Sequence, residues 1–285
     1  MGLTPKTALW DGLAWGIRTR WMGHGSYLIY SRYRHPLNVI DEHTEIVIEA
    51  FPRSANTFAT VAFQLSQPAP VRVAHHLHAP AQVIAAVRRG VPALVPVRHP
   101  RDAAISQVIR SPGLSLSQVL AAYTRFHTQL LPYRTGFHVA TFEQVTTDFG
   151  AVIHAVNRRF GTAFGVFPHS SETVAEVYRM IDERARSPQL FEAVAAYRSG
   201  MMSRSDLDAV FQCARAGSAV ASVPGHRVAR PTRERTEPQA DLRVQYASAN
   251  LNGVRENAER VYERITSGPE RVEPERLADA SSCAS

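Results

Sequence analysis

The stretch EIVIEAFPRSANTFATVAFQ, residues 45–64, decides the fold. An apolar run ends at Pro52, a short polar loop follows, and a helical pattern begins at Thr57. Short, nearly continuous apolar runs are typical of strands in a parallel sheet that is covered on both faces. Ligands of such sheets sit beyond the carboxyl ends of the strands, where helix N-termini attract anions. The stretch therefore predicts an anion-binding loop at one edge of a parallel sheet.

Three further apolar runs follow with helical patterns between them. They are VRVAHH at 71–76, ALVPVR at 93–98 and FHVATF at 137–142. Helices are expected at 57–67, 79–89, 114–130 and 144–160, with more helical pattern at 170–220 and 240–265. Alternation of strands and helices predicts an α/β fold with a central parallel sheet flanked by helices.

The length of 285 residues and a hydrophobic content of 45% suit one large domain with short additions. Residues 1–40 mix Trp and Tyr with Arg, which indicates a substrate-side or membrane-facing segment, with possible peripheral membrane contact. A helix packed on the domain explains these residues more simply. Residues 41–266 are interpreted as the main domain and 267–285 as a disordered tail.

Charge and cysteine content narrow the class of protein. The net charge is +7 and Lys6 is the only lysine, so the positive charge is nearly all arginine. A basic chain attracts anions, but the basic residues form no stripe interleaved with aromatic residues, so nucleic acid is not favoured as a partner. Cys213 and Cys283 provide neither a disulfide framework nor a zinc motif, and a cytoplasmic location fits best. The chain contains no run of about 18 apolar residues, so the sequence predicts no membrane span.

The loop after the first strand lacks the parts of an ATP-binding P-loop. The Walker A pattern G-x-x-x-x-G-K-[ST] needs two glycines and a lysine, and residues 51–58 contain none of them. Arg53 offers a fixed positive charge, with Ser54, Asn56 and Thr57 as polar neighbours. Ser and Thr at such a position are also ordinary helix caps. The residue types alone leave an anion site and a capped structural turn equally open.

FPRSANTF resembles the 5′-phosphosulfate loop of the sulfotransferases that use 3′-phosphoadenylyl sulfate (PAPS), whose pattern is aromatic-Pro-Lys/Arg-Ser-Gly-Thr-Thr-aromatic. This chain departs from the pattern at two positions, where alanine replaces glycine and asparagine replaces threonine. The residues that the resemblance assigns to the nucleotide are Arg53, Ser54, Ala55, Asn56, Thr57 and Phe58. Because an alanine disfavours positive φ, we expect the backbone at Ala55 to avoid that region.

A second motif stands about 45 residues further on, in VPVRHPRDAAIS at 95–106. Arg98 ends a strand and Ser106 lies on the helix that opens after it, with Asp102 in the first turn. The segment resembles the 3′-phosphate motif of the same family, Arg-x-Pro-x-Asp followed by Ser. The resemblance implies that Arg98 and Ser106 hold the 3′-phosphate. A strand-Pro-helix turn with an incidental Arg and Ser is the plainer interpretation.

The resemblance thins towards the C-terminus. It places Phe142 near the adenine, although a core aromatic is an equally good interpretation. The family has a late basic loop over the 3′-phosphate, and GHRVARPTRER offers Arg230 for that contact, with Arg227 and Arg233 as alternatives. A solvated Arg-rich loop explains the same segment.

Three histidines lie at the end of the second predicted strand, in VAHHLHAP. They could form part of a metal site, or be ordinary polar residues at a strand end. The resemblance places a general base here, at His76 first, His78 second and His75 third. Histidine, with a reference pKa of about 6.5, can take the proton of a hydroxyl near neutral pH.

The resemblance implies a three-layer, P-loop-like form of the α/β fold. It also implies transfer of a sulfuryl group from PAPS to an acceptor hydroxyl, which leaves adenosine 3′,5′-bisphosphate. In catalysis Arg53 would stabilise the charge that develops on the leaving phosphate, so no metal is expected. The acceptor is a small molecule, a sugar or a glycolipid. Two alternatives remain: an atypical nucleotide or sugar kinase, with Asp102 as its Mg²⁺ carboxylate, and a non-catalytic nucleotide-binding module. The oligomeric state is open.

Overall fold

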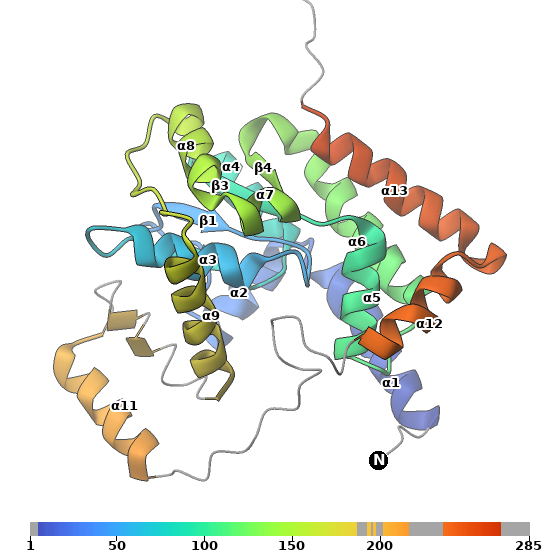
Figure 1. Ribbon diagram of the computed structural model, residues 1–285, viewed down its shortest axis with the longest axis horizontal. Coiled ribbons are helices and arrows are strands. Elements are labelled where there is room, and N and C mark those ends of the chain that lie inside the picture. The colour runs from blue at the N-terminus through green and yellow to red at the C-terminus, as the bar shows by residue number, and fades with distance from the viewer. Residues whose placement is uncertain (1–4, 187–192, 195, 198–201, 217–235, 269–285) are drawn as a thin grey trace, which may run out of the picture.

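The computed structural model describes residues 5–186, 193–194, 196–197, 202–216 and 236–268 (Figure 1). Four strands form one parallel sheet in the order β2-β1-β3-β4. They are β1 (Ile46–Ile48), β2 (Val73–His75), β3 (Ala93–Val97) and β4 (His138–Thr141). Each lies inside its predicted apolar run. The predicted α/β fold, with a central parallel sheet flanked by helices, is confirmed.

Helices account for most of the remaining described chain. They are α1 (Pro5–Trp21), α2 (Gly25–Arg34), α3 (Asn56–Ser66), α4 (Pro80–Arg89), α5 (Pro100–Arg110), α6 (Leu116–Leu130), α7 (Phe142–Thr147), α8 (Phe149–Phe160), α9 (Ser171–Arg186), α11 (Arg204–Ala216), α12 (Thr236–Tyr246) and α13 (Asn252–Thr266). Two 3-10 helices, η1 (Leu131–Gly136) and η4 (Ala249–Leu251), join neighbouring helices and strands.

The single helix expected at 144–160 is wrong. The chain breaks at Asp148, which ends α7 and caps α8 by accepting a hydrogen bond from the Ala151 N–H at 3.0 Å. An aspartate competes with the helical backbone in this way, and it favours a helix start over a helix interior. The helices expected at 57–67, 79–89 and 114–130 are found within two residues of their predicted ends.

The two faces of the sheet are covered by different helices, which makes the three layers visible in Figure 1. Val47 of β1 faces a core built with α4, α5, α6 and α13. Ile46 and Ile48 face a second core built with α3, α8 and α9. This alternation follows from the two-residue period of a strand, and burial on both sides explains why the run has no polar face. Strand β1 therefore lies at the centre of the molecule.

Helices α1 and α2 belong to the first core. Met22 and Tyr27 are buried in it, and α1 packs against α6. The simpler prediction, an N-terminal helix packed on the domain, is confirmed with two helices in place of one. The opposite side of α1 carries Trp10, Leu13 and Ile17, which are exposed.

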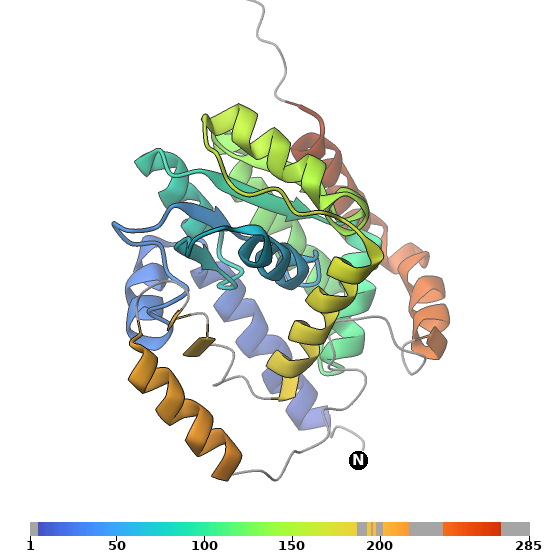
Figure 2. The same cartoon turned by 60° about the vertical axis from the view of Figure 1, so that its left-hand side comes forward.

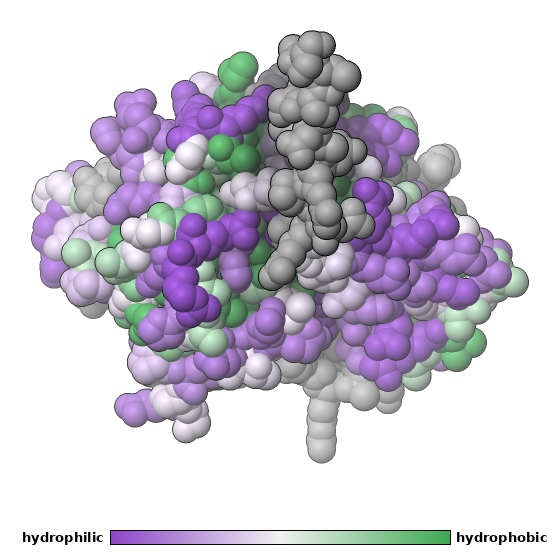
Figure 3. Space-filling view, turned by 90° about the horizontal axis from the view of Figure 1, so that it is seen from above, coloured by the Kyte–Doolittle hydropathy of each residue, from purple (hydrophilic) through white to green (hydrophobic). Residues whose placement is uncertain are grey.

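The C-terminal pair α12 and α13 lies on the opposite side of the molecule from α11 (Figure 2). The surface seen from above is mostly hydrophilic, with apolar residues in small scattered groups (Figure 3). Across the described ranges, every helix is too short or too polar to cross a bilayer.

Candidate functional site

The loop between β1 and α3 has a left-handed backbone at two residues. Arg53 has φ 70° and Ala55 has φ 66°. The expectation that Ala55 avoids positive φ is therefore wrong. Ala55 is the N-cap residue of α3, and the chain makes its left-handed turn into that helix there. An L-residue in this region costs roughly 1–2 kcal/mol relative to the right-handed form.

This loop presents polar groups that protein atoms do not satisfy. Ala55 has no side-chain oxygen for the first-turn N–H groups of α3, which carry the positive end of the helix dipole. Within the described chain, the Ser54 hydroxyl and the Asn56 side-chain oxygen are buried without a hydrogen-bond partner. Buried polar atoms without a partner are destabilising, and at a functional loop they indicate a missing ligand. The Ser54 hydroxyl and the N–H groups of the loop can donate to a phosphate or phosphosulfate, whereas the Asn56 oxygen is an acceptor and needs a donor instead.

The two motifs predicted from the sequence meet in space. Arg53 Nε donates to Ser106 Oγ at 2.9 Å, and Arg98 Nη1 donates to the Arg53 carbonyl at 3.1 Å. The Tyr123 hydroxyl of α6 donates to the Arg98 carbonyl at 2.7 Å and fixes the end of β3. The pairing of β1 with β3 places both loops at one edge of the sheet. Two arginines and a serine thus gather beside the N-terminus of α3.

Two aromatic residues assigned to the adenine lie in different surroundings. Phe142 is half-buried at the start of α7, and the Arg98 guanidinium carbon lies 4.1 Å from its ring centroid. Phe58 is 5% exposed and packs against Phe149 and Phe167 in the second core. Phe142 is therefore beside the candidate site, whereas a contact between Phe58 and a nucleotide base stays a prediction.

His76 and His75 form a hydrogen-bonded chain that begins at Thr57. The Thr57 hydroxyl lies 3.0 Å from His76 Nε2, and His76 Nδ1 lies 2.8 Å from His75 Nδ1. His75 is buried at the end of β2, and His76 is left-handed with φ 60°. Both ring nitrogens of His76 are thus engaged by neighbouring side chains.

His78 is held differently. Its φ is 54°, and its Nδ1 lies 2.8 Å from the Ala50 carbonyl oxygen. A carbonyl can only accept, so in the neutral ring the proton belongs on Nδ1 and the lone pair on Nε2. That is the tautomer in which Nε2 can accept a proton.

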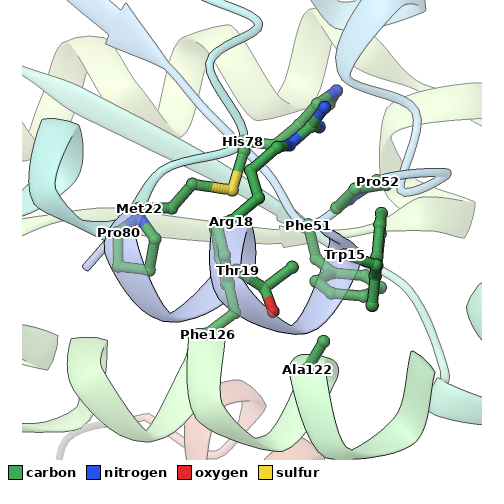
Figure 4. Close-up of a pocket in the computed structure, with 10 residues that line it drawn as sticks. All are labelled: Trp15, Arg18, Thr19, Met22, Phe51, Pro52, His78, Pro80, Ala122 and Phe126. Atoms are coloured by element: carbon green, nitrogen blue, oxygen red, sulfur yellow. The ribbon is translucent and has the colours of Figure 1, made fainter. Parts of the chain in front are cut away.

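A pocket lies beside His78, between α1, α6 and the loop after β1 (Figure 4). Trp15 and Phe51 line one side and Phe126 lies below, so much of the wall is aromatic. His78 and Arg18 extend towards the same end of the pocket. In the described part of the chain, the Trp15 indole N–H is buried without a hydrogen-bond acceptor. The walls thus combine aromatic faces with polar groups around a narrow space.

Sequence reasoning missed Glu49, a fully buried residue directly after β1. Its carboxyl group accepts hydrogen bonds from five N–H donors: the backbone of Ala50, Leu77 and His78 and the side chains of Asn56 and Gln82. Burial raises the pKa of Glu49 to about 8, and the hydrogen bonds from Ala50, His78, Leu77 and Gln82 oppose that rise. The sequence did carry one signal of it, because Glu49 is a charged residue within the apolar run 45–51.

Other predicted residues contribute less. Asp102, the carboxylate of the kinase alternative, pairs with Arg101 at 3.1 Å in the first turn of α5. The loop with Arg227, Arg230 and Arg233 lies outside the described residues, as does the tail from 269 onward. Over the residues that the structure covers, no group of three or more His, Cys, Asp or Glu is arranged to hold a metal ion.

No protein-family model matches the chain, and no curated protein matches it. A crystal structure of mouse sulfotransferase SULT7A1 complexed with PAP is similar at 13% sequence identity, over 81% of this chain and 92% of that one. The TM-score is 0.35. A likeness of this size carries no argument about activity, so any functional conclusion depends on the site itself.

Proposed function

We propose that the chain is a sulfotransferase that moves a sulfuryl group from PAPS to an acceptor hydroxyl. The observation that carries the proposal is the contact of Arg53 Nε with Ser106 Oγ at 2.9 Å. It joins two motifs that are distant in sequence and that resemble, independently of each other, the two phosphate motifs of one nucleotide. A chance likeness in either motif would not by itself bring them to the same point.

The nucleotide is expected to lie across the carboxyl ends of β1 and β3. The 5′-phosphosulfate would rest on the loop after β1, where Arg53, the Ser54 hydroxyl and the N-terminus of α3 offer charge and donors. The 3′-phosphate would contact Arg98 and Ser106, with Arg230 as a further candidate. Phe142, whose ring lies under the Arg98 guanidinium, would pack beside the adenine.

The reaction needs a base and a stabilised leaving group. The acceptor oxygen attacks the sulfur, a new S–O bond forms, and the S–O bond to the 5′-phosphate breaks. The acceptor proton passes to a histidine, and adenosine 3′,5′-bisphosphate departs with the electron pair. Arg53 and the N–H groups of the loop stabilise the negative charge that develops on the leaving phosphate.

The acceptor is expected to bind in the pocket between α1 and α6. This pocket adjoins Pro52 of the nucleotide loop and reaches His78 (Figure 4). Its aromatic wall favours an acceptor with an apolar part, and the Trp15 N–H can bind one of its oxygens. A small phenol, a sugar or a glycolipid meets these requirements.

Ligand-dependent thermal stability tests the nucleotide site. We expect adenosine 3′,5′-bisphosphate to raise the melting temperature, because a ligand at a hundred times its Kd adds about 2.7 kcal/mol to the stability. Arg98→Ala should remove most of that increase. Arg88→Ala is the matched control, since Arg88 is exposed in the last turn of α4 and bonds Tyr133. Stabilisation by ATP-Mg²⁺ alone would contradict the proposal and favour the kinase alternative.

Transfer itself is tested with [³⁵S]PAPS and three acceptors: 2-naphthol, lactose, and galactosylceramide in detergent micelles. The proposal predicts a labelled product with at least one of them. Binding of the bisphosphate without transfer to any acceptor would favour the non-catalytic nucleotide-binding module.

A further inference from the structure

Glu49 connects three parts of the candidate site through one carboxyl group. Its Oε1 accepts from the Asn56 side chain of the nucleotide loop at 3.2 Å and from the His78 backbone at 3.0 Å. Its Oε2 accepts from the Leu77 backbone at 3.0 Å and from the Gln82 side chain of α4 at 3.1 Å.

The donor pattern specifies an anion. All five contacts come from N–H groups, so a proton on either oxygen of Glu49 would face a donor in place of an acceptor. Burial acts in the opposite direction and favours the neutral acid. The geometry is nevertheless that of a carboxylate, because five donors around a neutral acid would leave its own O–H without an acceptor.

This carboxylate holds the chain in a conformation that it would otherwise avoid. His76 and His78 both have positive φ, and the Leu77 and His78 N–H groups point to Glu49 from between them. A buried anion that accepts from two successive N–H groups compensates the backbone strain at this turn. The same anion lies 3.9 Å from His78 Nδ1, on the side of the ring where the Ala50 carbonyl accepts the Nδ1 proton.

We propose that Glu49 is a positioning residue that makes His78 the general base and ties its placement to the nucleotide loop through Asn56. The inference rests on the proposed sulfotransferase function for the identity of the reaction. His78 is chosen because its Nδ1 contact with the Ala50 carbonyl sets the tautomer with the lone pair on Nε2 and because its ring lines the pocket (Figure 4). His76 contacts Thr57 and His75 through its two ring nitrogens.

The arrangement also suits the charge that forms during transfer. When His78 Nε2 takes the acceptor proton, the ring becomes a cation with both nitrogens protonated. Its Nδ1–H then faces the Ala50 carbonyl and the Glu49 carboxylate, which stabilise the positive ring. In hydrolases a carboxylate that bonds the histidine directly both fixes the tautomer and stabilises the imidazolium. Here the Ala50 carbonyl fixes the tautomer, and Glu49, at 3.9 Å, contributes the stabilising charge.

The wild-type protein provides a test that needs no change at Glu49. The ring nitrogens of His78, identified by the signals that disappear in His78→Gln, are observed by ¹H–¹⁵N NMR at pH 8, where a histidine of ordinary pKa is neutral. We expect the proton on Nδ1. A proton on Nε2 of His78 would overturn the inference, whatever the activity of the protein.

Glu49→Gln tests the carboxylate, since it keeps the shape but places an NH₂ among N–H donors. We expect kcat for [³⁵S]PAPS transfer to fall by on the order of 10²-fold or more, with the Kd for the bisphosphate weakened by less than about tenfold. Asp41→Asn is the matched control, because Asp41 is also a hydrogen-bonded carboxylate but pairs with Arg72. It should keep wild-type kcat.

The double variant separates positioning from general destabilisation. If Glu49 acts through His78, Glu49→Gln should lower activity little or not at all further in a His78→Gln background. If the double variant loses activity by the product of the two single losses, the inference is overturned. If Glu49→Gln does not fold, the NMR test decides alone. Absence of transfer by the wild type would defeat the proposed function, while the tautomer of His78 would still test whether His78 is able to act as a base.

Discussion

Four residues other than glycine adopt positive φ in the described chain, and all lie at the candidate site: Arg53, Ala55, His76 and His78. Such conformations persist where the surrounding contacts determine them, and they gather at functional sites. Here the contacts are visible as the bonds among Arg53, Arg98 and Ser106 and the donors around Glu49. The site is therefore preorganised at a cost in stability.

Ala55→Gly tests that cost. Glycine adopts positive φ without steric penalty, but it also gains freedom in the unfolded chain. We expect a net rise in the free energy of unfolding of up to about 1 kcal/mol, measured by urea denaturation. Ala151→Gly, at an exposed helical position in α8, is the control and should lower it by roughly 0.5–1 kcal/mol. Equal losses in both variants would mean that Ala55 is not strained.

The sequence locates some residues of the site better than others. Arg53, Arg98 and Ser106 stand in motifs whose order and spacing can be found in a linear chain, and the structure brings them together. The function of Glu49 depends on backbone N–H groups at 77 and 78, which reach it only once β2 has paired with β1. The conformation of Ala55 is set by the turn into α3, against the preference of the residue itself. Neither is encoded in a local pattern.

At the scale of the elements, apolar runs predict the strands and most helices, and the Gly, Pro and capping residues between them predict where these elements end. This works because the apolar residues of each element are the ones that it buries. The error at Asp148 arises because helices α7 and α8 share one continuous apolar periodicity, and a single capping carboxylate divides them. The strands are also shorter than their apolar runs. In β1, the run continues into residues whose burial comes from the loop and from α6, such as Phe51 against Tyr123.

Helix α6 packs against Phe51 at the start of the nucleotide loop, so the contribution of α6 to stability can be tested next. Ser115 caps it in a capping box, accepting from the Gln118 N–H while the Gln118 side chain accepts from the Ser115 N–H. Ser115→Ala should lower the free energy of unfolding by about 1 kcal/mol, as measured by urea denaturation. Because the cap is exposed and remote from Arg53, the Kd for the bisphosphate should not change. A changed Kd with unchanged stability would contradict this prediction, because Ser115 would then affect the nucleotide site without stabilising α6.

On the scale of the whole molecule, the first core contains a histidine among aromatic rings. His127 of α6 is fully buried, lies against Phe51, Tyr123 and Phe126, and holds its Nδ1 3.0 Å from the Tyr123 carbonyl. Burial lowers the pKa of His127 to about 4, since a charge in this core would have no solvent around it. The folded state thus excludes a proton that the unfolded chain accepts.

Because only the unfolded chain binds this proton, the free energy of unfolding depends on pH. The contribution of His127 is complete above pH 6.5 and is lost as the pH falls towards 4, by roughly 3 kcal/mol in total, from 1.36 kcal/mol per pKa unit. His127→Phe should flatten the dependence of unfolding free energy on pH between 6.5 and 4, measured by urea denaturation. Burial and Arg159 lower the pKa of His138 to about 4 as well, so a smaller slope should remain. The exposed His43→Gln control should keep the wild-type slope.

The position of Phe51 bears on how the protein is made. Apart from Arg230, the side chains assigned here to the two phosphates lie between Glu49 and Ser106, and so do the three histidines. This part of the site therefore leaves the ribosome as one continuous segment. Helix α6, whose Tyr123 and Phe126 rings cover Phe51 and whose Tyr123 hydroxyl fixes the Arg98 carbonyl, is synthesised afterwards. Until then this segment has an uncovered apolar face, and exposed apolar surface of this kind makes a growing chain prone to association.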